Sequence, residues 1–306
     1  MKTTATSTRV TYAACPVCHS ESIAPVLTAS DHTVSGESFE VWHCNSCQLR
    51  FTQQAPDETA IGSYYQSEEY ISHSNTRKGL VNRLYQWVRD FTLVQKRKLI
   101  RKVSGMQTGA LLDIGCGTGE FLNTMKQAGW TSLGLEPDPG ARQQAIEHFQ
   151  LDVHPSDHLF QLAAKQWDVI TMWHVLEHVH RLHPYLDKIY ELLKPGGKLI
   201  IAVPNYQSLD AAKYESAWAA YDVPRHLYHF SPEAMQRLLS DHGFQWSTLK
   251  TMPFDAFYVS LLSEKYIHGK LRLIPGFLTG LRSYLASLRQ PARCSSVMYI
   301  VQKPLT

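Results

Sequence analysis

From residue 109 onward, short apolar runs alternate with segments whose apolar residues recur at helical spacing. The segments predict helices near 118–128, 138–149, 157–165 and 182–194. The runs predict strands at Ala110–Ile114, Thr131–Glu136, Asp152–His154, Trp167–Met172 and Leu199–Val203. Because strands that alternate with helices form parallel βαβ units, the sequence predicts an α/β fold with a doubly wound sheet.

A long insertion interrupts this alternation near the C-terminus. A predicted helix at 232–242 precedes two last strands at Trp246–Met252 and Val297–Val301, which about 45 residues separate. Within the insertion, five apolar residues share one helical face: Phe277, Leu278, Leu281, Leu285 and Leu288. We expect this helix to cover its own domain as a lid or core cover; a dimer contact and a peripheral membrane contact through 265–294 are the alternatives.

Four of the six cysteines stand in two Cys-x-x-Cys pairs, 25 residues apart, at Cys15, Cys18, Cys44 and Cys47. Two such pairs favour a structural zinc site, because each pair forms a knuckle whose thiolates point at one ion. Disulfide and redox roles are the alternatives. The chain is therefore divided into a zinc-binding module over 1–55, a small zinc ribbon, a helical lid or linker over 56–104, and an α/β domain over 105–306 with a helical insertion at 255–294.

Composition and charge narrow the function classes. A hydrophobic content of 44% with 19% charged residues excludes a largely disordered chain. The formal net charge of +3 is too small to indicate nucleic-acid binding. However, six Lys or Arg and no acidic residue lie between Lys265 and Cys294. The Thr/Ser-rich N-terminus lacks the apolar core of a secretory signal, so we expect a cytoplasmic protein. We also expect the protein to be a monomer or a homodimer.

A glycine-rich turn follows the first predicted strand, in the run Asp113-Ile114-Gly115-Cys116-Gly117-Thr118-Gly119. Glycines let the backbone approach a ligand at the carboxyl end of a strand. Glu136 ends the next strand, where an acid can bind both hydroxyls of a ribose. A dinucleotide-binding loop is the alternative, but its spacing is Gly-x-Gly-x-x-Gly rather than Gly-x-Gly-x-Gly.

This stretch resembles the first motif of class I S-adenosylmethionine-dependent methyltransferases, and the likeness extends over about 105–250, through 167–170 and 193–199. The resemblance implies a Rossmann-like, mostly parallel sheet of seven strands, with the last strand antiparallel. It also implies S-adenosyl-L-methionine as cofactor, its methionine part held by Asp113 and the Gly115–Gly119 backbone and its ribose by Glu136. We expect Pro137 to line this site, Asp157 to meet the adenine and Cys116 to be a small packed residue.

After the fourth strand, the segment His174-Val175-Leu176-Glu177-His178 is similar to the Glu-x-x-Glu-His of ubiquinone-biosynthesis O-methyltransferases, whose residues bind a divalent ion. Here His174 stands in place of the first Glu, which makes a magnesium site less favourable. We expect His174 and His178 to contact the substrate. The alternative is that Glu177 and His178 only pack beneath the cofactor.

A denser polar cluster follows the fifth strand and resembles the Tyr-His-Glu-His-x-x-Tyr-Phe-Ser stretch of zinc-containing sugar C-methyltransferases, with Arg225 in place of the Glu. We expect His226 to act as a general base, with His229 and Tyr70 as further catalytic residues. Packing alone is the alternative for the cluster and for Tyr70. The predicted substrate-binding residues are Tyr221, Asp222 and Arg225, the last through a phosphate or carboxylate.

Together these features predict a small-molecule methyltransferase that acts on a sugar, a nucleotide sugar or another polysaccharide or secondary-metabolite precursor. An RNA base methyltransferase, a quinone or lipid O-methyltransferase and a cofactor-free binding scaffold are the alternatives. Against RNA as substrate, Trp173-His174 follows the fourth strand instead of an Asn-Pro-Pro-Tyr type of motif.

Overall fold

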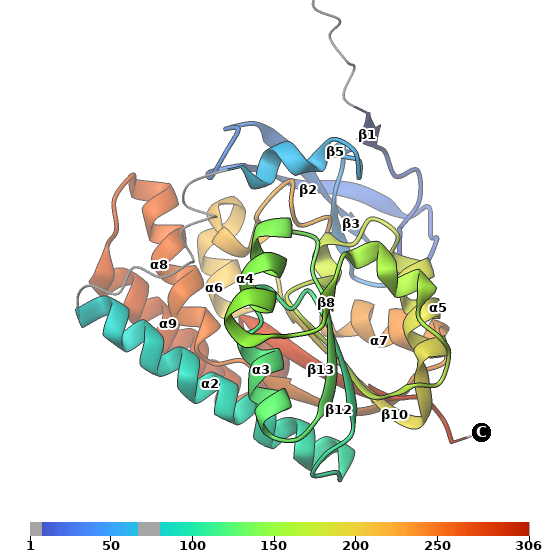
Figure 1. Cartoon of the computed structure of the whole chain (residues 1–306). Helices are drawn as coiled ribbons and strands as arrows, with labels where there is room; N and C mark the ends of the chain where they lie inside the picture. Colours follow the sequence, from blue (N-terminus) through green and yellow to red (C-terminus); the bar gives the residue numbers. More distant parts are fainter. Residues whose placement is uncertain (1–7, 67–79, 306) are drawn as a thin grey trace, which may run out of the picture.

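A computed structural model describes residues 8–66 and 80–305, and a seven-stranded sheet forms its centre (Figure 1). The order is β12-β13-β10-β9-β6-β7-β8, and only β13 runs antiparallel to its neighbours. The strands are β6 (Ala110–Ile114), β7 (Thr131–Leu135), β8 (Val153–His154), β9 (Trp167–Trp173), β10 (Leu193–Pro204), β12 (Gln245–Thr251) and β13 (Ser296–Gln302). The predicted α/β class, strand count and antiparallel last strand are confirmed.

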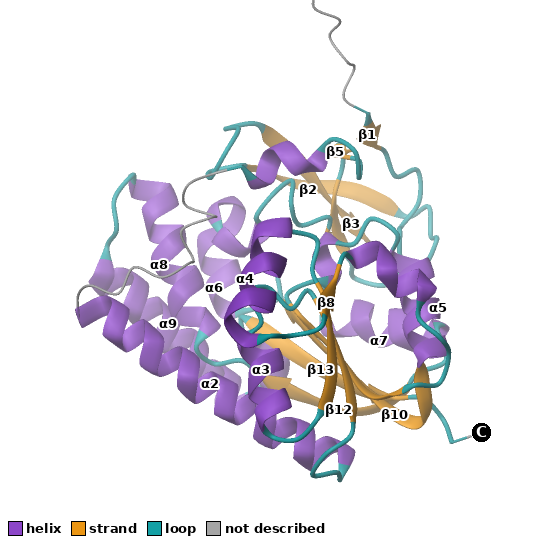
Figure 2. Ribbon diagram, viewed as in Figure 1, coloured by secondary structure: helices purple, strands orange, loops and turns teal. Residues whose placement is uncertain are grey.

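Helices cover both faces of this sheet (Figure 2). Buried side chains of α2, α3 and α4 pack against one face, and those of α5 and α7 against the other. The helices are α2 (Leu80–Ser104), α3 (Glu120–Gln127), α4 (Pro139–Phe149), α5 (Leu182–Leu192), α6 (Leu209–Tyr214), α7 (Pro232–Asp241), α8 (Asp255–His268) and α9 (Leu273–Arg289). No helix in the described ranges has both the length and the apolar content of a membrane span.

The predicted helix at 157–165 is wrong in kind and length. A 3-10 helix, η2 (Ser156–Gln161), stands there instead, and an extended residue, Leu162, ends it. The other 3-10 helices are η1 (Ile61–Tyr65), η3 (Leu176–His178), η4 (Glu215–Ala217), η5 (Ala219–Tyr221) and η6 (Pro291–Arg293). These 3-10 helices are short connecting turns, because their hydrogen-bond geometry is poorer than that of an α-helix and long runs are uncommon.

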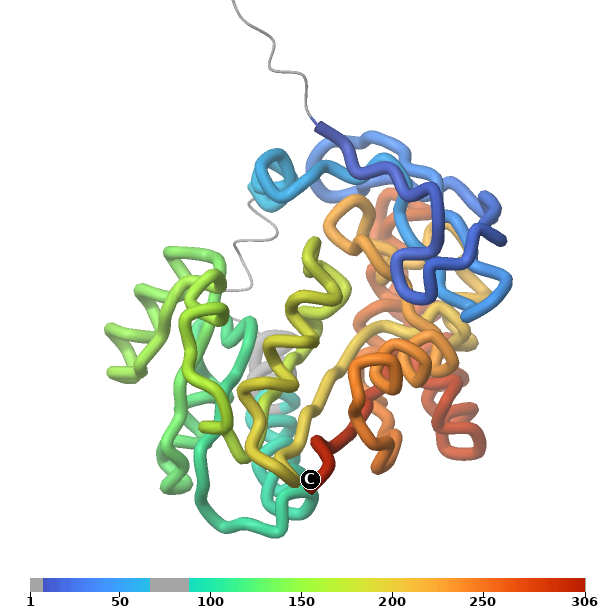
Figure 3. Tube along the Cα trace, turned by 90° about the vertical axis from the view of Figure 1, so that its right-hand side faces the viewer, coloured from blue at the N-terminus to red at the C-terminus, as the bar shows by residue number. Residues whose placement is uncertain are grey.

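The N-terminal module is the blue part at the top of Figure 3. It contains most of a second sheet, whose strand order is β11-β4-β3-β2. Its strands are β2 (Ile23–Ser30), β3 (Ser38–Cys44), β4 (Arg50–Thr52) and β11 (Tyr228–His229), and β1 (Arg9–Val10) pairs separately with β5 (Ala55–Pro56). The sequence did not predict β2, in which only Ala29 is fully buried. In β11, Tyr228 pairs with Phe51 and His229 with Arg50, so the α/β domain contributes one strand to the module.

A buried arginine also joins the two parts. Arg225 is 1% exposed, and its Nη2 donates to Asp31 of the module at 3.1 Å and to Asp222. Its Nη1 donates to the Tyr64 carbonyl at 2.9 Å, and its Nε donates to Asp222 at 3.0 Å. Burial alone would raise the pKa of Asp31, but backbone N–H groups and Arg225 lower it to about 2. The expectation that Arg225 binds a substrate anion finds no support here, because its hydrogen bonds are internal.

The helical insertion forms an antiparallel pair, α8 and α9, but its predicted orientation is wrong. The five apolar residues do share a face of α9, yet four of them (Phe277, Leu278, Leu285 and Leu288) are exposed. The buried face of α9 carries Gly276, Thr279, Gly280, Ser283 and Ser287 instead. The apolar face therefore does not cover the core of this domain.

The Arg225 network predicts a large loss of stability in the Arg225→Met variant. Removal of one partner leaves Asp31 as an uncompensated buried charge, and such losses are about 3–5 kcal/mol in the free energy of unfolding. Urea unfolding measures this quantity. The matched control, Arg237→Met, removes an exposed ion pair with Asp241 and is expected to change stability little. Equal losses in both variants would show that the Arg225 network does not stabilise the fold.

Candidate active site and cysteine cluster

The glycine-rich turn between β6 and α3 forms the floor of the candidate site. A Cβ atom at Gly115 (φ +73°) would lie 2.3 Å from Val175 Cγ2, so no larger residue fits there. A Cβ atom at Gly117 would meet no atom within 4 Å, which leaves open space above the loop for a ligand. Beneath the loop, burial raises the pKa of Asp113 to about 7, although Thr171 donates a 2.6 Å hydrogen bond to it.

Glu136 stands beside this loop, at the end of β7. Its Oε2 accepts from the Gly117 N–H at 2.8 Å, and its Oε1 accepts from the Asp138 N–H at 3.0 Å. Burial raises the pKa of Glu136. A carboxylate has about four lone-pair sites, so acceptor capacity remains for two ligand hydroxyls. The predicted second acid is therefore in contact with the loop.

The remaining residues predicted for this site lie around it. Cys116 is buried, and a Cβ atom at Gly134 would lie 2.6 Å from its Sγ, as expected of a small packed residue. The Pro137 carbonyl accepts a 2.7 Å hydrogen bond from Arg142. Asp157 is exposed in η2, which follows the end of β8. Its contact with adenine stays a prediction.

A second group of side chains begins two residues after Val175 and brings together Glu177, His178 and His226. Each offers one potential ligand atom, and these atoms lie within 4.8 Å of one another. Glu177 is fully buried, and neither of its carboxylate oxygens has a hydrogen-bond partner in the described part of the chain. The rings of His178 and His226 meet edge to face at 4.6 Å. A buried carboxylate without hydrogen bonds is costly unless a nearby positive charge, a proton or a ligand compensates it, and His174 Nδ1, 3.4 Å from Oε1, supplies one such charge.

Protonation states follow from these neighbours. Burial alone would raise the pKa of Glu177, but His174, His178 and His226 lower it. Burial and the nearby His226 lower the pKa of His178 to about 4, so this ring is neutral at physiological pH. The His226 Nδ1 lies 2.9 Å from the Ala220 carbonyl, which can only accept. The proton of a neutral His226 is therefore on Nδ1, and its Nε2 carries a lone pair.

His174 lies between Glu177 of this cluster and Asp255. Its Nε2 lies 3.0 Å from Asp255 at the start of α8, and its Nδ1 lies 3.4 Å from Glu177. Burial opposes its charge, but Asp255 and Glu177 raise the pKa of His174 to about 10. His174 is therefore a charged partner of α8, and its predicted contact with the substrate has no support in this geometry.

Two tyrosines belong to the predicted lid region, and only Tyr70 was a predicted site residue. The Tyr65 hydroxyl of η1 lies 3.0 Å from His178 Nδ1, so a lid-region tyrosine does reach the cluster. Tyr70, the tyrosine predicted to be catalytic, lies outside the described residues.

Tyr221 and His229 face the N-terminal module. The Tyr221 hydroxyl accepts a 2.6 Å hydrogen bond from Arg50, and His229 Nε2 lies 3.1 Å from Thr52 Oγ1. Burial lowers the pKa of His229 well below its usual value, and the two rings meet edge to face at 4.9 Å. Their predicted roles in substrate binding and catalysis stay predictions. Asp222 does belong to the cluster, because its Oδ2 lies 3.9 Å from His226 Nε2.

Two charged residues near the site, Lys96 and Asp255, were not predicted from the sequence. The Lys96 Nζ of α2 lies 4.0 Å above the Trp173 ring at the end of β9. Burial lowers the pKa of Lys96 to about 8, whereas the nearby Asp113 and Asp255 favour its charge. Asp255 is distant in sequence from the glycine loop, and Lys96 belongs to the helix before β6, so neither residue is part of the motif.

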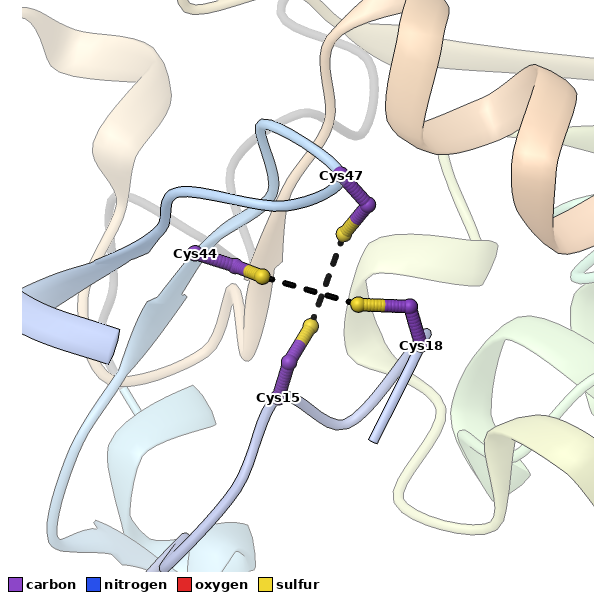
Figure 4. Close-up of side chains that lie close together, drawn as sticks. All are labelled: Cys15, Cys18, Cys44 and Cys47. Atoms are coloured by element: carbon purple, nitrogen blue, oxygen red, sulfur yellow. Dashed lines mark hydrogen bonds between the residues drawn. The ribbon is translucent and has the colours of Figure 1, made fainter. Parts of the chain in front are cut away.

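The four predicted cysteines of the module come together from two knuckles (Figure 4). The Sγ atoms of Cys15 and Cys47 are 3.5 Å apart, as are those of Cys18 and Cys44. A disulfide would require about 2.0 Å. A tetrahedral zinc ion with Zn–S bonds of ~2.3 Å separates its sulfur ligands by ~3.8 Å. The donor set and its spacing therefore fit a zinc ion.

Comparisons with known proteins point to one family. Residues 89–249 match the family described as "Methyltransferase domain". The ubiquinone biosynthesis O-methyltransferase of Rattus norvegicus mitochondria is 26% identical over 173 residues, which cover 51% of this chain and 49% of that protein. That of Azorhizobium caulinodans is 25% identical over 169 residues, covering 51% and 65%. The chain thus spans about half the length of the rat protein and about two thirds of the bacterial one.

One solved structure supports the fold alone. The cyclase SpnF superposes with a TM-score of 0.50 at 17% identity, covering 69% of this chain and 81% of that chain. A methyltransferase from Archaeoglobus fulgidus gives 0.47 at 21% identity, covering 70% and 94%. The N-terminal module lies outside the matched family region, which starts at residue 89.

Proposed function

Because this chain belongs to the methyltransferase domain family, we propose that it is an S-adenosylmethionine-dependent enzyme that methylates a small molecule. One observation carries the proposal. Val175 contacts the glycine loop, and the Glu177–His178–His226 cluster begins two residues later. The cofactor loop and a cluster able to accept a proton are therefore neighbours, as transfer of a group between two bound molecules requires.

On the cofactor side, Asp113, the loop backbone at 115–119 and Glu136 would hold S-adenosylmethionine. When bound, this cofactor supplies a methyl group on a sulfonium. The open space above Gly117 and the remaining acceptor capacity of Glu136 suit a ligand with ribose hydroxyls.

On the acceptor side, His226 is the general base. Its Nε2 lone pair takes the proton of the acceptor hydroxyl, and Asp222, 3.9 Å away, stabilises the imidazolium that forms. Tyr65 and His178 form the neighbouring wall. Two imidazoles and a carboxylate could also hold a divalent cation such as zinc at this position.

Among acceptor classes, we place a phenolic or quinol hydroxyl first and a sugar or nucleotide sugar second. Support for the first comes from the relatives, which are named ubiquinone biosynthesis O-methyltransferases. The internal bonds of Arg225 weaken the argument for a nucleotide sugar, because that residue was the predicted phosphate ligand. A cytoplasmic location and a monomeric or homodimeric state stay predictions.

For the cysteine cluster we propose one structural zinc ion. Its four thiolates leave no open position for a substrate, so the ion would stabilise the module rather than react. The module in turn pairs through β4 with the strand that follows His226, so the ion would act indirectly on the position of the general base.

The proposed function is tested by isothermal titration with S-adenosylmethionine, in the wild type and in Glu136→Ala. The variant is expected to bind about 10- to 100-fold more weakly, because ligand hydroxyls and the Gly117 N–H lose their acceptor. Glu147→Ala, an exposed position on α4, is the control. Wild-type protein that does not bind the cofactor would contradict the proposal. Product mass spectrometry with phenols, nucleotide sugars and RNA then distinguishes the acceptors.

His226→Ala is expected to reduce turnover by roughly 10²-fold or more, with an unchanged dissociation constant for the cofactor. His148→Ala, an exposed histidine on α4, is the matched control. Unchanged turnover would show that His226 is a packing residue and not the general base. Metal analysis separates the two hypotheses for the cluster: a metal bound there adds a second ion per chain, which His226→Ala loses, to the zinc expected at the cysteines, whereas a general base adds none.

Elemental analysis of the purified protein is expected to give one zinc ion per chain. Cys44→Ser should lose this zinc and unfold at a lower temperature, because a structural zinc contributes directly to folding. Cys294→Ser, which lies outside the cluster, should keep it. A metal-free wild type, or a Cys15–Cys47 disulfide found by mass spectrometry, would refute the site.

A further inference from the structure

Helix α9 presents its apolar face to solvent. Ile274 is 74% exposed and Leu288 is 63% exposed, and neighbouring residues on α9 and on the turn before it are exposed as well. We call this surface the hairpin face. Its residues are Ile267, Leu271, Leu273, Ile274, Phe277, Leu278, Leu285 and Leu288. Contiguous exposed apolar surfaces of this kind mark sites that bind a partner or a membrane.

The packing of α9 on α8 fixes this orientation. A Cβ atom at Gly276 would lie 2.8 Å from Leu261 Cδ2, and one at Gly280 would lie 2.7 Å from the Phe257 Cα. The two helices are therefore too close for leucines to take the inner positions. Helices in lipid also pack through small residues, because burial of apolar side chains between them does not drive their association there.

The charges beside the hairpin face are all positive. Arg282 and Arg289 follow the leucines by four residues each along α9, and both are exposed. With Lys270 they make no ion pair or hydrogen bond within the described part of the chain. Glu264, the nearest acid in the sequence, is buried beneath Tyr214 and Lys213, and it pairs with Arg272 at 3.6 Å but not with Arg282, Arg289 or Lys270. An exposed apolar face with a basic border is typical of a helix that lies in the plane of a membrane surface.

We propose that the hairpin face binds the surface of an anionic lipid bilayer, with its leucines and phenylalanine in the interface and its arginines at the headgroups. The alternative occupant, a second copy of the chain, would place the same uncompensated positive charges against each other across a two-fold axis. Binding of lipid needs no methyl transfer, so this proposal stands or falls separately from the proposed function.

Co-sedimentation of the full chain with vesicles tests the proposal. Vesicles of phosphatidylcholine alone are compared with vesicles that also contain phosphatidylglycerol, at low and high salt. The wild type is expected to sediment with the anionic vesicles, and less so at high salt, because salt screens the arginine contribution. Protein that stays in the supernatant with both kinds of vesicle would overturn the proposal.

Two double variants separate the charge from the apolar contribution. Arg282→Glu/Arg289→Glu and Leu278→Ser/Leu285→Ser are each expected to lower the partition coefficient by about tenfold or more. The charge control is Lys165→Glu/Arg237→Glu, at exposed positions away from the hairpin. The apolar control is Val26→Ser/Ile146→Ser, whose residues are 43% and 41% exposed, close to the 47% and 50% of the leucines.

The proposal is supported if the two control variants bind vesicles like the wild type while the two hairpin variants bind more weakly. Loss of binding in the controls to the same extent would overturn it, since the effect would then not depend on the hairpin. Light scattering covers the remaining outcome. A wild-type dimer that Leu278→Ser/Leu285→Ser converts to a monomer, with no vesicle binding, would make the hairpin face a subunit interface instead.

Discussion

The buried guanidinium of Arg225 holds the N-terminal module and the loop around His226 in one arrangement. It bonds to Asp31 of the module, to the Tyr64 carbonyl of η1 and to Asp222 of the loop. A buried charge is tolerated only when partners surround it, so Asp31 and Asp222 must both be in place for this interior to be stable. Asp222 also lies beside His226, so the same interaction positions a neighbour of the general base.

This constraint explains why the module and the α/β domain are not independent. The proposed zinc ion would order the knuckles. The strand that follows the second knuckle, β4, pairs with β11 just after His226. The neighbouring wall of the site comes from η1, whose Tyr65 contacts His178. The glycine loop and Glu136 belong to the sheet alone. The cofactor side is thus built by one domain, and the acceptor side is built where two parts of the chain meet.

The sequence could predict the parts of the site that short motifs encode. The glycine loop, Glu136 and the four cysteines each need only local geometry and a neighbouring strand end or knuckle. It could not predict the partners of Arg225 and His174, because their charges are satisfied by Asp31 and Asp255, far away in the chain. The orientation of the apolar face of α9 could not be predicted either. A periodic pattern shows that a helix has an apolar face, but not which medium covers that face, and the signal in Gly276 and Gly280 was overlooked.

The pairing of β4 with β11 has a consequence for biosynthesis. Thr52 and His229, which meet across this pairing, are 177 residues apart. A ribosome adds about 5–20 residues per second, so the edge of β4 waits roughly 9–35 s for its partner strand. During that time the edge offers free N–H and C=O groups to any other extended chain. Nascent chains are therefore most prone to mispairing between completion of the cysteine knuckles and emergence of β11.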